Sequence, residues 1–215
     1  MKSYTRIFAS LALLGCGAPA FAQVYQYPPT RPLQWFIDGG ATVTQGRTAD
    51  FLGSGWTIGT GFTLRPAPGP FMLRVDLNYS RFGATNQLIS LGQAVNGTQV
   101  DNGYGQTVTG FLSGVLQAPV NPWMRFYATG GVGLGYRRIE LTQNAFLCDA
   151  FFCGSDFGSS TLVASQATTR FAWNAGLGVD FALPGGQSWF VEARYERIET
   201  VEPTEFIPIR FGLRF

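Results

Sequence analysis

Apolar residues recur at every second position in several segments of this chain, with polar residues or glycine between them. In one segment Ile58, Phe62 and Leu64 share one parity and are separated by threonines and glycines. Successive side chains of a β-strand point to opposite faces, so this period of two predicts strands with one apolar and one polar face. Segments 71–82 and 168–183 repeat the pattern. The chain is therefore expected to be an all-β protein.

Eight such segments are expected between residue 33 and the C-terminus, each near or above the roughly 9 to 11 residues with which a tilted strand crosses a bilayer. They are 33–44, 55–65, 71–82, 104–117, 123–138, 168–183, 188–198 and 206–215. Long connections alternate with short ones rich in proline or glycine, which is typical of a membrane barrel. No helix of comparable length is expected. The register of segment 104–117 stays open, because its apolar residues fall on both faces.

The composition indicates which solvent surrounds these strands. Hydrophobic residues make up 46% of the chain and charged residues only 13%, which is lean in charge for a domain surrounded by water. No stretch reaches the roughly 18 unbroken apolar residues that a spanning helix needs. Strands cross a bilayer only as a closed barrel, in which every backbone polar group has a partner. The sequence therefore predicts an eight-stranded antiparallel up-and-down transmembrane β-barrel over residues 33–215.

The N-terminus has the pattern of a secretory signal peptide. Lys2 and Arg6 precede an apolar run, and Ala22 ends a small-residue pattern of the kind that precedes a cleavage site. We expect residues 1–22 to direct export and to be removed, so that the mature protein begins at Gln23 and resides in the outer membrane of a bacterial cell.

The N-terminal region also contains a candidate lipoprotein signal and a proline-rich segment. Residues 13–16 resemble a lipobox ending at Cys16, so a lipoprotein signal is the alternative interpretation. Residues 23–32 contain three prolines and cannot pair as a central strand. They are expected to form an extended leader on the periplasmic side.

Cys148 and Cys153 lie in a polar, glycine-containing part of the longest connection. Outside the cytoplasm two such thiols favour a disulfide over a metal site, because the chain has no histidine to complete one. We expect this disulfide, and neither a metal nor another cofactor. The glycines of segment 130–135 superficially resemble a phosphate-binding loop, but the chain continues as an alternating strand instead of a helix.

Twelve charged residues of the predicted strands lie on the polar parity, which we expect to face the inside of the barrel. The seven arginines and five acids are Asp38, Arg74, Asp76, Arg125, Arg137, Arg170, Asp180, Glu192, Arg194, Glu196, Arg210 and Arg214. Leaving a buried charge without its partner costs about 3 to 5 kcal/mol, so we expect these side chains to form an ion-pair network that fills the lumen. The excess of two arginines leaves open a narrow path that tolerates anions.

Two further features concern the surface of the barrel. The four tryptophans on the apolar parity near predicted strand ends are Trp35, Trp56, Trp173 and Trp189. They are expected to anchor the barrel at the headgroups, although Trp123 is not explained in this way. After removal of residues 1–22 the chain has 13 basic and 13 acidic residues, so a nucleic-acid partner lacks an electrostatic basis.

The last ten residues place an apolar side chain at every second position up to a terminal phenylalanine. Phe211, Leu213 and Phe215 are expected outward, and Arg210 and Arg214 inward. This ending resembles the C-terminal signal recognised by the barrel assembly machinery. With the signal peptide and eight spans, the chain resembles the family of outer-membrane β-barrel domains that includes the OmpA transmembrane barrel and the OmpX, Ail and opacity proteins. The resemblance implies two partners, outer-membrane lipids and the assembly machinery.

Two functions remain open. Barrel enzymes of this membrane resemble one another in using a histidine for proton transfer, and this chain has none, so we expect no enzyme. The first expectation is a structural or surface-interaction barrel that presents residues 83–103 and 139–167 to a surface ligand. The alternative is a transport protein, either a narrow channel for small solutes or an OmpW-like conduit for small apolar molecules.

Overall fold

The computed structural model describes residues 32–67, 69–96, 102–144, 147–149, 152–154 and 160–215. The predicted signal peptide, its cleavage site between Ala22 and Gln23, and Cys16 lie outside these residues, as does the proline-rich leader up to residue 31. These assignments therefore stay predictions.

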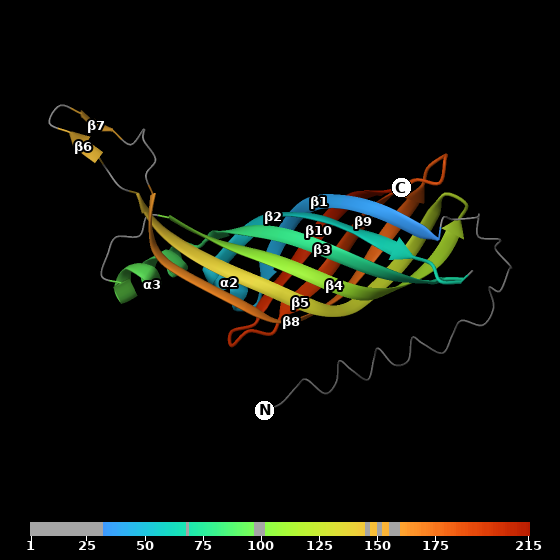
Figure 1. Ribbon diagram of the computed structural model, residues 1–215, viewed down its shortest axis with the longest axis horizontal. Helices are drawn as coiled ribbons and strands as arrows, with labels where there is room; N and C mark the ends of the chain where they lie inside the picture. The colour runs from blue at the N-terminus through green and yellow to red at the C-terminus, as the bar shows by residue number, and fades with distance from the viewer. Residues whose placement is uncertain (1–31, 68, 97–101, 145–146, 150–151, 155–159) are drawn as a thin grey trace.

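Eight antiparallel strands close into one barrel (Figure 1). They are β1 (Leu33–Gln45), β2 (Leu52–Leu64), β3 (Phe71–Ala84), β4 (Asn102–Asn121), β5 (Met124–Asn144), β8 (Ser160–Ala182), β9 (Ser188–Ile198) and β10 (Thr204–Arg214). Consecutive barrel strands pair with each other, and β1 closes the ring by pairing with β10. The predicted eight-stranded up-and-down barrel is confirmed.

Side chains alternate between the lumen and the outer surface along each strand. In β10 the side chains of Arg210 and Arg214 are buried, whereas Phe211 and Leu213 are about half exposed on the outside. The alternation predicted for the last strand is confirmed.

Strand β4 shows why its register could not be predicted. Phe111 and Val115 point into the lumen and are 2% exposed, whereas Leu112 and Leu116 face outward and are more than half exposed. Both faces of β4 carry large apolar residues, because two of its inward side chains belong to the apolar clusters of the lumen. A period-two pattern then no longer identifies the inner face.

The short and long connections lie at opposite ends of the barrel (Figure 1). The short-turn end carries the connections 65–70, 122–123 and 183–187. Gly185 and Gly186 have φ angles of 87° and 83°, which glycine adopts without strain. The loop end carries α2 (Thr48–Phe51), α3 (Asn86–Asn96) and a hairpin of β6 (Leu147–Asp149) and β7 (Phe152–Gly154). No helix among the described residues is long and apolar enough to cross a membrane.

The loop end differs from the sequence-based expectation in two ways. Helix α3 covers 11 residues of the connection 83–103, so the expectation of no helix of comparable length is wrong. Its Leu88 packs on buried apolar side chains at the barrel mouth, which stabilises the helix. Strand β5 continues to Asn144 and strand β8 already begins at Ser160, so both extend well into the predicted connection 139–167. Beyond Leu141 these extensions lack the apolar alternation that identified the spans.

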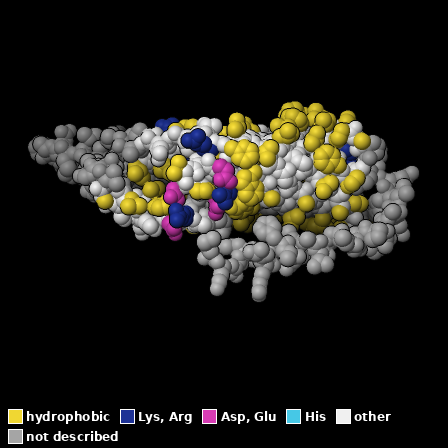
Figure 2. All heavy atoms as spheres, turned by 90° about the horizontal axis from the view of Figure 1, so that it is seen from below, with side chains coloured by type: hydrophobic (Ala, Val, Ile, Leu, Met, Phe, Trp, Pro, Cys, Tyr) yellow, Lys and Arg dark blue, Asp and Glu magenta, His cyan; other side chains and the backbone are white. Residues whose placement is uncertain are grey.

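The outer surface carries an apolar belt. Leu134 and Leu177, for example, are 63% and 69% exposed on strands β5 and β8. Figure 2 shows hydrophobic side chains spread over the visible outer face, with charged side chains gathered toward the loop end. The charge-poor part of the surface suits a hydrocarbon environment.

Aromatic side chains lie at both ends of this belt. At the short-turn end the ring of Phe181 stacks between the rings of Trp189 and Trp123. Its centroid lies 4.1 Å from that of Trp189 and 6.1 Å from that of Trp123. Trp123 thus joins an aromatic row at this end, which its strand parity alone did not indicate. Toward the loop end, Trp56 and Trp173 each pack against a tyrosine at 5.4 Å.

Candidate functional site

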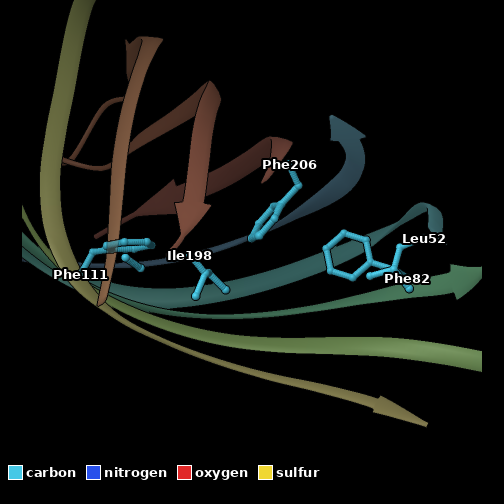
Figure 3. Close-up of a cluster of buried hydrophobic side chains, with 6 residues drawn as sticks. Leu52, Phe82, Phe111, Ile198 and Phe206 are labelled. Carbon is cyan, nitrogen blue, oxygen red and sulfur yellow. The ribbon is translucent and has the colours of Figure 1, made fainter. Parts of the chain in front are cut away.

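The lumen is the candidate site, because the predicted charged residues meet there between two apolar clusters. The cluster nearer the loop end, which we call the upper cluster, consists of Leu52, Phe82, Phe111, Ala172, Ile198 and Phe206 (Figure 3). All six side chains are at most 2% exposed, and the rings of Phe82 and Phe206 pack edge to face at 5.3 Å. This cluster closes the loop end of the lumen.

The cluster nearer the short-turn end, which we call the lower cluster, consists of Phe36, Met72, Val115, Tyr127 and Phe190. Lumen glycines leave the space for its rings. A Cβ atom added at Gly178 would lie 2.3 Å from the Tyr127 ring, and one at Gly212 would lie 2.5 Å from the Phe190 ring. Small residues opposite large ones allow an eight-stranded barrel to be filled.

Between the two clusters lies a layer of buried ion pairs centred on Arg74 and Arg194. Glu192 bridges the two guanidinium groups, because each donates to one of its oxygens at 2.7 Å. Asp76 also contacts both, at 2.9 Å from Arg194 Nη1 and 3.4 Å from Arg74 Nε. These side chains are at most 1% exposed. Charges of opposite sign thus alternate, as buried ions require.

Arg210 extends this layer toward the upper cluster. Its guanidinium pairs with Glu196 and donates to Asn78 Oδ1 at 2.8 Å. Thr109 donates to the other oxygen of Glu196 at 3.2 Å. The Asn78 amide donates to Asp76 at 2.7 Å and so connects Arg210 to the pairs below. We call this connected group the ion-pair layer.

Asp38 is the member of the ion-pair layer with the weakest contacts. Its Oδ2 lies 3.7 Å from Arg74 Nη2, and neither of its oxygens accepts a hydrogen bond from a described residue. The side chain is nevertheless buried. Its burial is therefore opposed by a desolvation cost that hydrogen bonds do not offset.

A separate group of charges lies near the short-turn end. Asp180 accepts from Arg125 at 2.7 Å, from Arg214 at 3.2 Å and from the Gln117 amide at 3.2 Å. The Arg214 guanidinium lies 5.1 Å from the centre of the Phe190 ring. This group therefore covers the lower cluster on the side of the short turns.

Two predicted residues stay outside these contacts. Arg137 is half buried and donates to the Thr204 hydroxyl at 2.8 Å, and Arg170 is exposed near the loop end. Neither forms an ion pair with a residue that the structure describes. The structure thus brings ten of the twelve predicted residues into ion pairs.

The sequence analysis missed the apolar part of the lumen. Phe36, Phe82, Phe190 and Phe206 are at most 1% exposed and lie on the same parity as the charged residues of their strands. That shared parity is the signal in the sequence that identifies these phenylalanines as lumen residues.

The predicted disulfide concerns the hairpin of β6 and β7. Its backbone register places Cys148 directly opposite Cys153. A disulfide joins residues whose Cα atoms lie about 4.4 to 6.8 Å apart, which suits residues directly opposed across two strands. The two side chains lie outside the described part of the structure, so the bond stays a prediction.

Comparison with known proteins gives a fold and a family. No curated protein sequence matches this chain. Among solved structures, Neisserial surface protein A is 13% identical, with 86% of this chain and 96% of that chain covered and a TM-score of 0.53. A major outer membrane protein from Thermus thermophilus is 12% identical, with a TM-score of 0.52. The match covers 86% of this chain and 99% of that chain. At these identities the likeness shows a shared fold alone.

The family comparison covers nearly the whole chain. The sequence model of the outer membrane protein β-barrel domain matches residues 8–215. This range includes all eight strands of the closed barrel. The chain therefore belongs to the outer membrane protein β-barrel domain family.

Proposed function

We propose that this outer-membrane barrel is sealed and serves a structural or surface-interaction role, without conducting solutes. The observation that carries the proposal is the filling of the lumen by two apolar clusters with the ion-pair layer between them. The interior of an eight-stranded barrel is just wide enough for side chains. A permeating ion would have to displace both clusters and separate buried charges.

The ion-pair layer supports this proposal because its contacts cross the lumen. Strands β3 and β9 lie four positions apart in the ring of eight, on opposite sides of the barrel. The pairs of Arg74 with Glu192 and of Asp76 with Arg194 therefore bridge the interior. Leaving one of these buried charges without its partner costs about 3 to 5 kcal/mol, which opposes separation of the pairs.

The loop end supports a role at the cell surface. Strands β4, β5 and β8 contain 20, 21 and 23 residues, whereas β9 and β10 contain 11 each. One side of the barrel wall therefore extends further toward the loops, where α3 and the β6–β7 hairpin lie (Figure 1). Connections 83–103 and 139–167 thus offer surface for a ligand, and longer loops face outward in barrels of this type.

We also infer that three lumen acids, Asp76, Asp180 and Glu192, are structural. Asp76, Asp180 and Glu192 each contact two arginines, so they do not have the free carboxyl group that acid–base catalysis requires. The chain contains no histidine that could supply the same chemistry.

Single-channel recording tests the sealed lumen. The refolded protein in a planar bilayer should show no discrete conductance steps, while a general porin reconstituted in the same membrane provides the positive control. Stable anion-selective steps in the wild-type protein would contradict the proposal. Loss of such steps in Arg137→Gln would then support the channel alternative, because Arg137 lines the mouth without a carboxylate partner among the described residues.

A further inference from the structure

An apolar groove interrupts the outer surface of the barrel between strands β2 and β5. One hollow of about 730 Å³ is lined by outward side chains that include Leu77, Leu112 and Leu134. A second hollow of about 420 Å³ shares Leu77 and Val108 with the first and reaches Tyr79. Together they form one groove that lies in the apolar belt and runs toward the loop end.

Gly110 keeps this groove open. It lies on the outer face of β4, directly between Leu77 of β3 and Leu134 of β5. A Cβ atom added there would meet only Leu77 Cδ1, at 3.9 Å, so the packing of the barrel does not require glycine. Glycine inside a strand weakens it and often marks a site of close approach by another molecule.

Polar side chains lie just beyond the loop-side end of the groove. Arg81, Gln106 and Arg138 are direct cross-strand neighbours on β3, β4 and β5. Arg81 follows Tyr79 by two residues, which is about 7 Å along a strand. The groove therefore leads from the apolar belt to a row that contains two arginines.

Arg81 is the arginine of this row whose charge is available. Its guanidinium lies 4.3 Å above the Tyr104 ring, it is exposed, and it forms no ion pair with a described carboxylate. Arg138, by contrast, lies 2.5 Å from Glu140. A positive group above an apolar groove complements a molecule with an anionic head and a hydrocarbon tail.

We propose that this groove binds one phosphate-bearing lipid of the surface-facing leaflet. Its acyl chain lies along Gly110 between Leu77 and Leu134, and its phosphate accepts hydrogen bonds from Arg81. The groove lies within the apolar belt, where acyl chains are the molecules at hand. The charge of Arg81 selects the phosphate-bearing lipids among them.

Native mass spectrometry of the refolded full barrel tests this site. The probes are dipalmitoyl phosphatidic acid, dipalmitoylglycerol, which lacks the phosphate, and inorganic phosphate. We expect one phosphatidic acid per barrel, bound about tenfold more tightly than dipalmitoylglycerol, as for one charge-assisted hydrogen-bonded contact. Inorganic phosphate alone should not be retained.

Four variants separate the tail from the head. Gly110→Leu should weaken both lipids about tenfold, and Arg81→Gln should remove only the preference for phosphatidic acid. Gly130→Leu is the matched control, because Gly130 is also an outward glycine whose added Cβ would meet only one atom, Asn174 O at 3.8 Å, and it lies outside the groove lining. Arg47→Gln is the control for charge, because Arg47 pairs with Glu202 at the rim. Both controls should bind like the wild type.

Several results would overturn the proposal. Unchanged lipid binding by folded Gly110→Leu would do so, as would a phosphate preference that survives Arg81→Gln. A wild-type dimer that becomes a monomer in Gly110→Leu would assign the groove to a second copy of the chain. Heat-modifiable migration shows whether each variant is folded. If Gly110→Leu does not fold, Gly110→Ala should give a smaller loss in the same direction.

Discussion

Asp76 and Asp38 are both buried in the lumen but differ in the number of groups that bind them. Asp76 contacts two arginines and accepts the Asn78 amide. Asp38 has one arginine at 3.7 Å and no hydrogen bond from a described residue. A buried charge stabilises a fold only when its partners offset the loss of hydration. Two equally buried aspartates therefore need not stabilise the fold equally.

Asp76→Asn is expected to lower the free energy of unfolding by about 3 to 5 kcal/mol, because it leaves Arg194 and Arg74 short of a negative partner. Asp38→Asn should change it far less, since no described hydrogen bond is lost. Urea unfolding in detergent micelles, followed by tryptophan fluorescence, measures both. Equal losses for the two variants would show that Asp38 is as strongly paired as Asp76.

At the scale of one element, strand β10 combines the lumen, the belt and barrel closure. Its arginines are buried and its outward side chains are about half exposed. The backbone of Phe215 exchanges two hydrogen bonds with Trp35 of β1, at 2.9 and 3.0 Å, and so completes the seam. Phe211, Leu213 and Phe215 all lie on the outer face, where the proposed assembly signal could be recognised.

Phe211→Arg should reduce insertion, because an outward arginine in the apolar belt carries a cost that reaches about 2 to 4 kcal/mol at the bilayer midplane. The substitution also removes the packing of Phe211 on Trp189 at 5.6 Å. Gln45→Arg is the control, since Gln45 is an outward residue at the loop end of β1. The folded fraction after refolding into lipid vesicles, which contain no assembly machinery, measures the membrane cost alone. Equal folded fractions would show that Phe211 does not face lipid.

At the scale of the whole molecule, side chains fill the inside of the barrel and its wall is uneven in height. The inner side chains connect opposite walls, whereas the longer strands β4, β5 and β8 extend one wall toward the loops. Strand pairing between β5 and β8 continues up to Asn144 and Ser160. The longer strands and the loops between them form an exposed surface at the loop end, and this surface does not depend on an open lumen.

The position of this barrel in the cell depends on export. We expect the mature protein to begin at Gln23, because residues 1–22 have the pattern of a cleaved signal peptide. The intact mass of protein extracted from outer membranes measures the N-terminus directly. A mass that corresponds to a diacylglyceryl group on Cys16 would show that the lipoprotein interpretation is right.

The sequence by itself determined the fold class, the number of strands and the faces of most strands. Strands such as β3 alternate apolar and polar residues, and the pleat turns these to opposite faces whatever the partner strand is. The same local pattern placed the short turns. It failed for β4, where Phe111 and Val115 place apolar side chains on the inner face. It also failed for α3, whose Leu88 packs on the upper cluster, a contact that exists only in the folded barrel.

Only the tertiary structure decided which inner side chains meet. Arg74 and Glu192 are 118 residues apart in sequence, and they touch because closure of the ring places β3 opposite β9. The same closure brings the five lumen phenylalanines into two clusters and leaves Arg170 at the exposed rim. Periodicity within one strand reports the face of a residue but not its height relative to a distant strand. That height is set by the tilt and stagger of the closed barrel, which arise only when all strands pair.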